Sequence, residues 1–441
     1  MTGQLRDLLH ALADEQEQVR VDPDTYAAGR RAHRRGVLAR GALAAAAVAG
    51  VAFGTLPLLE EDAPGPAIGD PVPALPSVIR PVPDRLAGHR EDGYEWHEDV
   101  GADSLAVGAT AVVLPVNGGA VMAVSAIDGH YRGLKLPGFD EDSYFRFDGS
   151  SPVALSPDGA RLAYTWNPDV IDGDALEPGP ETGIRIADLG TGEVTDHPID
   201  SEFGVYAFGF GWSPDGRYLS YELQTVTDAN GGVRGSRNYA VELLDTVAGE
   251  RARLPLSPTE FGTTVNDAGQ VAVAGGGYNA VWTPGEEVIT FEGDFAGVSW
   301  SPQGRLLGLG SWSGGLAVAD RNGIRQELSG ERTSPDDMAY VRTRVLGWPE
   351  TSALAVLHLG ESSVRMHSAD LDFSMTLLTA DGVQGLDQIS VATDLLGRPT
   401  RDYPAPDWPT DWTRVGLWLR LSALILVPSA LLVWVRRRRR R

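Results

Sequence analysis

A four-residue motif, Ser-Pro-Asp-Gly, recurs along the chain and constrains its fold more than any other feature. It is complete at Ser156–Gly159 and Ser213–Gly216, and Gln replaces Asp in a third copy at Ser301–Gly304. The serine can hydrogen-bond the backbone of a turn, the proline presets φ, and the glycine supplies the positive φ at the fourth position. Each copy therefore predicts a tight turn between two strands.

Apolar and polar residues alternate on the far side of these turns, as in Ala160–Tyr164 and Arg217–Tyr221. A period of two is typical of half-buried strands, so each motif predicts a hairpin. Weaker copies stand at Val265–Val273 and Gly347–Glu350. A second hairpin follows in most units, as in Gly183–Val194, which gives four strands per unit. Four-stranded units in tandem predict an all-β fold, the β-propeller.

The repeats allow six or seven blades. Two segments, Leu75–Val82 and Ile389–Tyr403, remain outside the units that can be placed directly. Propellers often close by pairing strands from both chain ends, so these segments could form a composite seventh blade. We expect six or seven blades, with seven favoured. The six units that can be placed directly span about residues 104–138, 152–200, 205–256, 260–292, 295–330 and 340–380.

The Ser-Pro-Asp-Gly hairpins resemble the WD40-like propeller repeats of the TolB and prolyl-oligopeptidase type. The resemblance covers about residues 100–400. The Gly-His and Trp-Asp marks of true WD40 blades are missing. The arrangement of leader, apolar span, propeller and arginine tail is similar to that of membrane-anchored propeller proteins of actinobacteria. This resemblance implies a propeller fold held at a membrane and implies little about function.

Two apolar stretches lie near the chain ends. Gly41–Leu59 is uncharged and follows an arginine-rich segment, and Val415–Val435 is followed by six arginines. The first stretch, at about 1.5 Å per residue, extends roughly 28 Å, close to the thickness of a bilayer's hydrocarbon core. Arginine clusters outside both stretches predict that both termini are cytoplasmic and that the intervening chain is extracytoplasmic. The alternative for the first stretch is a cleaved signal peptide.

These features predict a two-pass protein of the cell membrane with the propeller outside. Two transmembrane helices flank the propeller, and a short amphipathic helix lies in the leader. The expected parts are a cytoplasmic leader (1–36), a first span (37–59), a linker (60–74), the propeller (75–404), a juxtamembrane linker (405–414), a second span (415–435) and a cytoplasmic arginine tail (436–441).

Charge separates along the same boundaries. The whole chain carries a net charge of −23, whereas residues 60–414, with 23 basic and 54 acidic residues, carry −31. Such an acidic domain repels nucleic acid, so we expect no nucleic-acid partner. The chain has no cysteine, which excludes thiolate metal sites, cysteine nucleophiles and disulfides.

The sequence lacks the motifs of the common hydrolases. Neither a Gly-x-Ser-x-Gly elbow nor a His-Glu-x-x-His motif occurs,. Acidic stretches at 140–148 and 169–177 lack the spacing of a dedicated calcium loop. We therefore expect no catalytic residue, no cofactor and no metal, and no enzymatic activity. The six histidines between the spans also lack metal-ligand spacing: His89, His97, His130, His197, His358 and His367,.

The membrane and leader segments contain two further candidate contact sites. Gly50 and Gly54 form a Gly-x-x-x-Gly motif on the first span, where a partner helix could approach closely,. A leucine stripe at helical spacing predicts an amphipathic leader helix that docks on the inner membrane surface or on a cytoplasmic regulator. The stripe comprises Leu5, Leu8, Leu9 and Leu12.

Three tryptophans, Trp212, Trp300 and Trp348, share one position in the repeat, and we expect them to pack between blades,. Insertions at 167–181 and 227–237 predict loops on one face of the disc,. We expect a non-catalytic binding module that takes an extracytoplasmic protein, peptide or glycan on this face. The alternatives are a transmembrane sensor that signals through the leader helix, and a propeller enzyme with carboxylates at the central channel.

Overall fold

The computed structural model describes residues 72–409 with internal gaps, and these residues belong to one compact unit, Pro71–Arg441. Nothing outside the described ranges enters the account of the structure. The gaps fall at 84–85, 91–92, 117–119, 140–150, 167–180, 227–238, 256–261, 276–277, 294, 296, 312–314, 321–322, 329–342, 351, 369–373 and 384–385.

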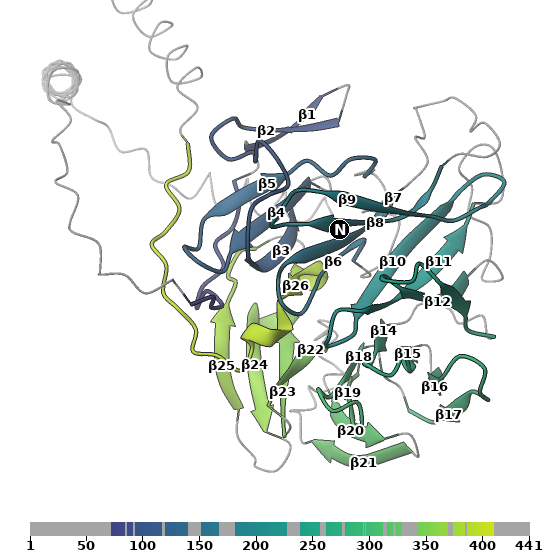
Figure 1. Ribbon diagram of the computed structural model, residues 1–441. Coiled ribbons are helices and arrows are strands. Elements are labelled where there is room, and N and C mark those ends of the chain that lie inside the picture. The colour runs from purple at the N-terminus through teal and green to yellow at the C-terminus, as the bar shows by residue number, and fades with distance from the viewer. Residues whose placement is uncertain are drawn as a thin grey trace, which may run out of the picture. The chain divides into compact units, whose positions relative to one another are not determined.

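The described residues form a six-bladed β-propeller. Each blade is a four-stranded antiparallel sheet, and the blades follow one another around a central axis (Figure 1). From the innermost strand outward, the blades are β26, β3, β4 and β5 (Ser390–Val391, Thr110–Val116, Ala120–Ser125, Tyr131–Leu134); β6 to β9 (Val153–Leu155, Arg161–Trp166, Gly183–Asp188, Val194–Pro198); β10 to β13 (Val205–Trp212, Tyr218–Thr225, Tyr239–Asp245, Arg251–Arg253); β14 to β17 (Gly262–Val265, Val271–Gly275, Tyr278–Trp282, Ile289–Phe291); β18 to β21 (Gly297–Trp300, Leu307–Gly310, Leu316–Asp320, Gly323–Leu328); and β22 to β25 (Thr343–Glu350, Ala353–His358, Ser363–Ser368, Ser374–Thr379).

The first blade closes the ring by combining strands from both ends of the domain. Its innermost strand, β26, comes from the C-terminal side and pairs Ser390 with Val113 and Val391 with Val112. The other three strands of this blade come from the N-terminal side. Closure of this kind gives the first blade its fourth strand and leaves only short inner edges, which face the channel,.

The preference for seven blades is therefore wrong. The C-terminal leftover segment supplies the missing inner strand of the first blade instead of building another blade. The N-terminal leftover segment forms isolated parallel bridges, from Pro76 to Arg401 and from Val78 to Thr379. The prediction that strands from both chain ends share a blade is confirmed, but this blade is the first of six and not a seventh.

The two ends of the described chain are held together beside this closure. The backbone nitrogen of Ser77 donates to the carbonyl of Arg401 at 2.9 Å, and that of Arg401 donates to Leu75 at 2.8 Å. The Ser77 hydroxyl also bonds the carboxylate of Asp402. The largest hydrophobic cluster spans the same junction and includes Leu75 with Val391. Burial of apolar side chains and backbone bonding together stabilise the closed ring.

The repeated turns adopt the conformation that their sequence predicts. The φ angles of Gly159, Gly216 and Gly304 are 72°, 67° and 63°. In the first of these turns, the glycine nitrogen donates to the carbonyl of Ser156 at 2.9 Å, and the Ser156 hydroxyl accepts from the nitrogen of Arg161 at 2.9 Å. The serine thus satisfies a backbone donor at the start of the second strand, which explains its recurrence.

The expected membrane helices, 37–59 and 415–435, lie outside the described residues. Within the residues that are described, no helix is long and apolar enough to cross a membrane.

Candidate functional site

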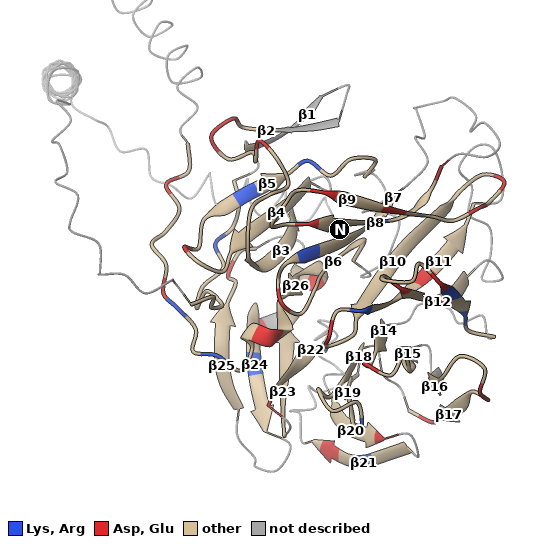
Figure 2. Ribbon diagram, viewed as in Figure 1, with Lys and Arg blue, Asp and Glu red and all other residues tan. Residues whose placement is uncertain are grey.

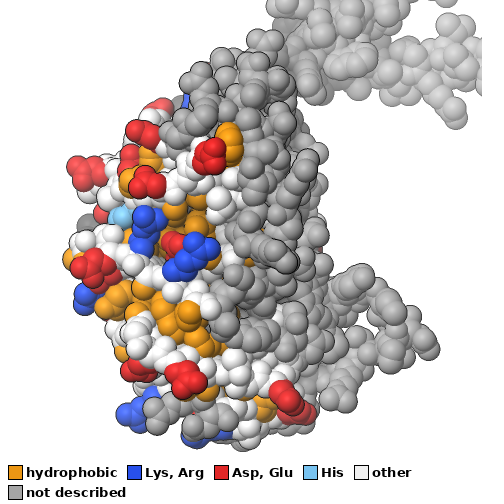
Figure 3. Space-filling model, turned by 90° about the vertical axis from the view of Figure 1, so that its right-hand side faces the viewer, with side chains coloured by type: hydrophobic (Ala, Val, Ile, Leu, Met, Phe, Trp, Pro, Cys, Tyr) orange, Lys and Arg blue, Asp and Glu red, His pale blue; other side chains and the backbone are white. Residues whose placement is uncertain are grey.

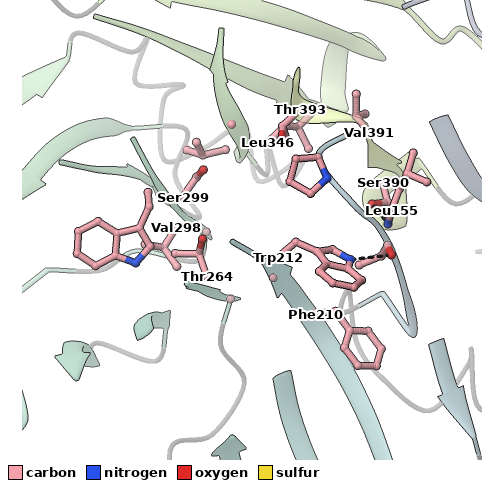
Figure 4. Close-up of a pocket in the computed structure, with 18 of the residues that line it drawn as sticks. Leu155, Phe210, Trp212, Thr264, Val298, Ser299, Leu346, Ser390, Val391 and Thr393 are labelled. Carbon is pink, nitrogen blue, oxygen red and sulfur yellow. Dashed lines mark hydrogen bonds between the residues drawn. The ribbon is translucent and has the colours of Figure 1, made fainter. Parts of the chain in front are cut away.

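A cavity of about 670 Å³ occupies the centre of the propeller. All six innermost strands contribute to its wall (Figure 4). Figure 4 shows Phe210 and Trp212 of β10, Thr264 of β14, Ser299 of β18 and Leu346 of β22 around this space. This volume is typical of sites for small molecules or for the end of a peptide.

Glycine keeps the innermost strands close together. A Cβ atom on Gly211 of β10 would lie 2.4 Å from the carbonyl oxygen of Thr263 and 2.8 Å from the Cα of Thr264, both on β14. A Cβ on Gly347 of β22 would lie 3.0 Å from a methyl group of Thr393. Without side chains at these positions, adjacent blades approach at backbone distance and the channel wall is continuous.

Two of the repeated tryptophans connect neighbouring blades as expected. Trp212 donates its indole N–H to the carbonyl of Ala154 at 3.1 Å (Figure 4), and Trp348 donates to the carbonyl of Ser299 at 3.1 Å. Each bond joins one innermost strand to that of the preceding blade. All three tryptophans also line the cavity, so blade packing and the channel wall use the same residues.

Trp300 departs from this pattern. Its side chain is 5% exposed, and its Nε1 has no hydrogen-bond partner among the described residues. Trp212 and Trp348 each find their acceptor on the innermost strand of the preceding blade. The equivalent acceptor for Trp300 would be the carbonyl of Thr264 on β14, where the repeat motif is weak. A buried N–H without an acceptor destabilises the folded state.

Charged residues are nearly absent from the innermost strands. Among the six, only β22 contains any, namely Arg344 and the exposed Glu350 at its end. The remaining charges lie mostly on turns and outer strands (Figure 2), and Figure 3 shows acidic side chains at several separate positions on one side of the molecule. Within the described ranges, the acidic residues therefore lie mostly outside the channel.

Arg344 lies near the start of β22 and lines the cavity. Its Nη1 donates to the carbonyls of Asp387 at 2.9 Å and Ile389 at 3.3 Å, which hold the guanidinium in place. Burial lowers the pKa of Arg344, and the nearby carboxylate of Asp387 opposes this effect. The protein thus keeps a cation in a poorly solvated position, where a ligand anion would be strongly attracted.

The opposite mouth of the channel contains the other charged lining residues, Asp394 and Arg398. The backbone nitrogen of Asp394 donates to the carbonyl of Pro157, in the turn between β6 and β7. Burial raises the pKa of Asp394, the charge of Asp158 raises it further, and Arg398 lowers it. Asp394 is the one carboxylate among the described lining residues, and no histidine lies among them.

The mouth near Arg344 opens on the face from which the longest connections leave. In each blade, the links from second to third strand and from one blade to the next begin at this face. The two predicted insertions, 167–181 and 227–237, are links of the first kind, after β7 and β11. Most of their residues lie outside the described ranges. However, β7 and β11 both end at this face, so both insertions leave from it as predicted.

One pair of histidines that the sequence treated as unrelated lies together in the sixth blade. His358 on β23 and His367 on β24 have their Nε2 atoms 2.8 Å apart. Burial lowers both pKa values, that of His367 to about 4, with the neighbouring His358 adding to the effect. No group of three or more metal-ligating side chains occurs in the described part of the chain.

The other candidate residues from the sequence lie outside the described ranges. These are the helix-packing pair Gly50 and Gly54, and the leader face Leu5, Leu8, Leu9 and Leu12. Sequence reasoning missed Arg344, since a single arginine in a weak repeat copy carries no motif. The available signal was its position as a charged residue in an otherwise uncharged innermost strand.

Comparison with known proteins adds no further assignment. No protein-family model matches the sequence, and no curated protein matches it. The fold therefore rests on the strand topology, and the site rests on the geometry of the channel.

Proposed function

We propose that this protein is a membrane-anchored, extracytoplasmic β-propeller that acts as a binding module, with its ligand in the central channel. The observation that carries the proposal is the 670 Å³ cavity walled by all six innermost strands. Its wall combines aromatic side chains with hydroxyl groups, backbone polar groups and three charged side chains, so it can contact both apolar and polar parts of a ligand. The expected ligand is part of an extracytoplasmic peptide, glycan or protein, or a molecule of similar size.

A binding role is also supported by the chemistry of the wall. General acid–base catalysis needs two titratable groups within reach of a substrate. The described lining offers one carboxylate, Asp394, and places it at the mouth opposite the half-buried cation Arg344. Recognition by shape, aromatic contact and a few charged groups uses these residues more directly than a reaction would.

The proposal is tested by filling the channel. Ser299→Trp adds an indole within the cavity (Figure 4), whereas Val247→Trp adds the same group at a turn position that is 80% exposed. The full-length protein and both variants are incubated with a mixture of small molecules and peptides from cell extract. Mass spectrometry then identifies the compounds that each protein retains.

The wild-type protein and Val247→Trp should retain the same compounds, and Ser299→Trp should lose them. Circular dichroism should show that both variants keep the β-sheet spectrum. If a folded Ser299→Trp retains the full set, or if the wild-type protein retains nothing, the channel is not the binding site.

A further inference from the structure

The channel presents a cation without a carboxylate partner. Arg344 donates to two backbone carbonyls through Nη1, and no ion pair to it occurs among the described residues. Its Nε and Nη2 are likewise without hydrogen-bond partners in that part of the chain. These two groups form the parallel fork that binds a carboxylate in a bidentate manner.

The position of Arg344 indicates that this arrangement is built into the wall. A Cβ on Gly297, the first residue of β18, would lie 3.7 Å from the Cα of Arg344 and 3.9 Å from its Cγ. Asp387 and Ile389 hold the guanidinium from the other side, in the connection that leads into β26. An arginine fixed by two neighbouring blades loses little conformational freedom when it binds an anion.

The aromatic part of the wall is suited to an apolar group, although hydroxyl and backbone polar groups lie between the rings. Six aromatic residues line the cavity, and one of them, Trp300, has a buried indole N–H without an acceptor. The aromatic residues are Phe208, Phe210, Trp212, Tyr239, Trp300 and Trp348.

The negative charge of the domain favours a ligand with a single negative group over a polyanion. Residues 60–414 carry a net charge of −31, and this field repels polyanions before they reach the channel. A ligand with a single negative group is repelled weakly, and the half-buried guanidinium of Arg344 offsets that repulsion at short range,.

We propose that the channel binds a single carboxylate attached to an apolar group, with the carboxylate on Nε and Nη2 of Arg344. The inference rests on the proposed function, because it assigns the ligand chemistry of the same channel. A free organic acid and the carboxyl terminus of a peptide both have this chemistry.

Matched pairs of probes test the inference on the full-length protein. The first pair is cinnamate and its neutral amide, cinnamamide. The second pair is the acetylated peptide Ala-Leu-Phe with a free or an amidated carboxyl terminus. Isothermal titration calorimetry should show that the charged member of at least one pair binds about tenfold more tightly or better. The pair with the larger preference distinguishes an organic acid from a peptide terminus.

Variants then test whether the preference for the charged probe depends on Arg344. Arg344→Gln should abolish it, and Arg344→Lys should retain a reduced preference, since lysine keeps the charge but not the fork. Arg253→Gln, on the exposed outermost strand β13, removes a charge away from the channel and should leave the preference intact. Arg344→Lys also guards against a glutamine variant that fails to fold.

Three results would overturn the inference. One is equal binding of charged and neutral probes to the wild-type protein. Another is a preference that survives in folded Arg344→Gln. The third is binding of neither member of either pair. Suppose that charged and neutral probes bind the wild-type protein equally and that Ser299→Trp abolishes this binding. The anion site would then be refuted, but the channel would remain a binding site. Binding of neither pair would count against both proposals.

Discussion

The innermost and outermost strands of one blade show how differently the two regions are built. In β18, three of four residues are buried, and none is charged. In β21, on the outer edge of the same blade, four of six residues are exposed. The inner strand lies between two neighbouring blades, while the outer strand is paired along one edge and faces solvent. Stability and ligand chemistry are therefore expected to depend on the inner strands, and solubility on the outer ones.

The largest contrast is expected from matched core truncations in the fifth blade. Leu309 on β19 is fully buried, whereas Ile324 on β21 is 41% exposed. Leu309→Ala should lower the free energy of unfolding by about 2 to 5 kcal/mol because it leaves a cavity, and Ile324→Ala by less than about 1 kcal/mol. Urea unfolding followed by circular dichroism measures both. Equal losses would show that the outer strand is as tightly packed as the second one.

Two turn glycines provide a second contrast. Gly159, between β6 and β7, and Gly249, between β12 and β13, have φ angles of 72° and 71°. A Cβ on Gly159 would lie 2.1 Å from the carbonyl oxygen of Thr110, while a Cβ on Gly249 would meet nothing within 4 Å. Gly249→Ala should cost about 1 to 2 kcal/mol for backbone strain alone, and Gly159→Ala about 2 to 4 kcal/mol.

Thermal unfolding checks the turn prediction as a difference between the two variants. The strain of a left-handed alanine is common to both and cancels. If Gly249→Ala proved the more damaging, contact between the inner turn and the neighbouring blade would not limit the stability of the ring.

The two tryptophan environments give a smaller effect within the inner region itself. Trp212→Phe removes a bond to the Ala154 carbonyl, whereas Trp300→Phe removes an N–H that has no acceptor. Both substitutions lose similar ring volume. Trp212→Phe should therefore be more destabilising than Trp300→Phe, by about 1 kcal/mol or more. Denaturant unfolding of the two variants measures the difference, and the reverse order would show that Trp300 donates to an acceptor in the ligand-free protein.

The smallest effect concerns the histidine pair in the middle strands of the sixth blade. The pKa of His367 is lowered to about 4 from 6.5, so the folded state resists a proton that the unfolded state accepts. Stability should consequently fall as pH decreases from about 6.5 towards 4 and change little above that range. Partial exposure and the neighbouring charge of Glu361 reduce the size of this effect, whereas the charge of Arg365 adds to it,.

His367→Gln should flatten the pH dependence over this interval. The matched measurement is the difference in unfolding midpoint between the variant and the wild-type protein at pH 7 and at pH 5. Binding of a channel ligand should be unaffected by the substitution, since neither histidine lines the cavity. A steeper pH dependence in the variant would contradict the assignment.

The propeller repeat could be predicted from the sequence because the turn motif and the strand alternation depend only on neighbouring residues. Ser156–Gly159 and its copies determine turns within four residues, and period-two alternation defines the strands on either side. The structure confirms both. The fold class and five complete four-stranded units follow from these signals, whose hydrogen bonds join residues close in sequence.

The number of blades was not determined by such signals. Strand β26 has two residues, and its partner β3 begins at Thr110, far away in the chain. A pairing this short and this distant leaves no pattern in either segment. The apolar residues of Ile389–Val391 were consistent with a new blade or with completion of the first, and only closure of the ring selects between them.

In the candidate site, too, features set by neighbouring residues could be predicted, and features set by distant contacts could not. Trp212, Trp300 and Trp348 share a motif position, and the sequence predicted their packing between blades, yet nothing in it marks Trp300 as the one without an acceptor. His358 and His367 are nine residues apart, a spacing that predicts no contact. Arg344 acquires its role from carbonyls 43 and 45 residues further along the chain.

The sequence by itself determined the turns, the strand alternation and hence the four-stranded unit, because turn and strand preferences act over a few neighbouring residues. The tertiary structure alone decided that six units close the ring, that the last inner strand completes the first blade, and that Arg344 faces the cavity without an ion pair to another described residue. Those outcomes depend on contacts between blades, which exist only when the whole ring is assembled.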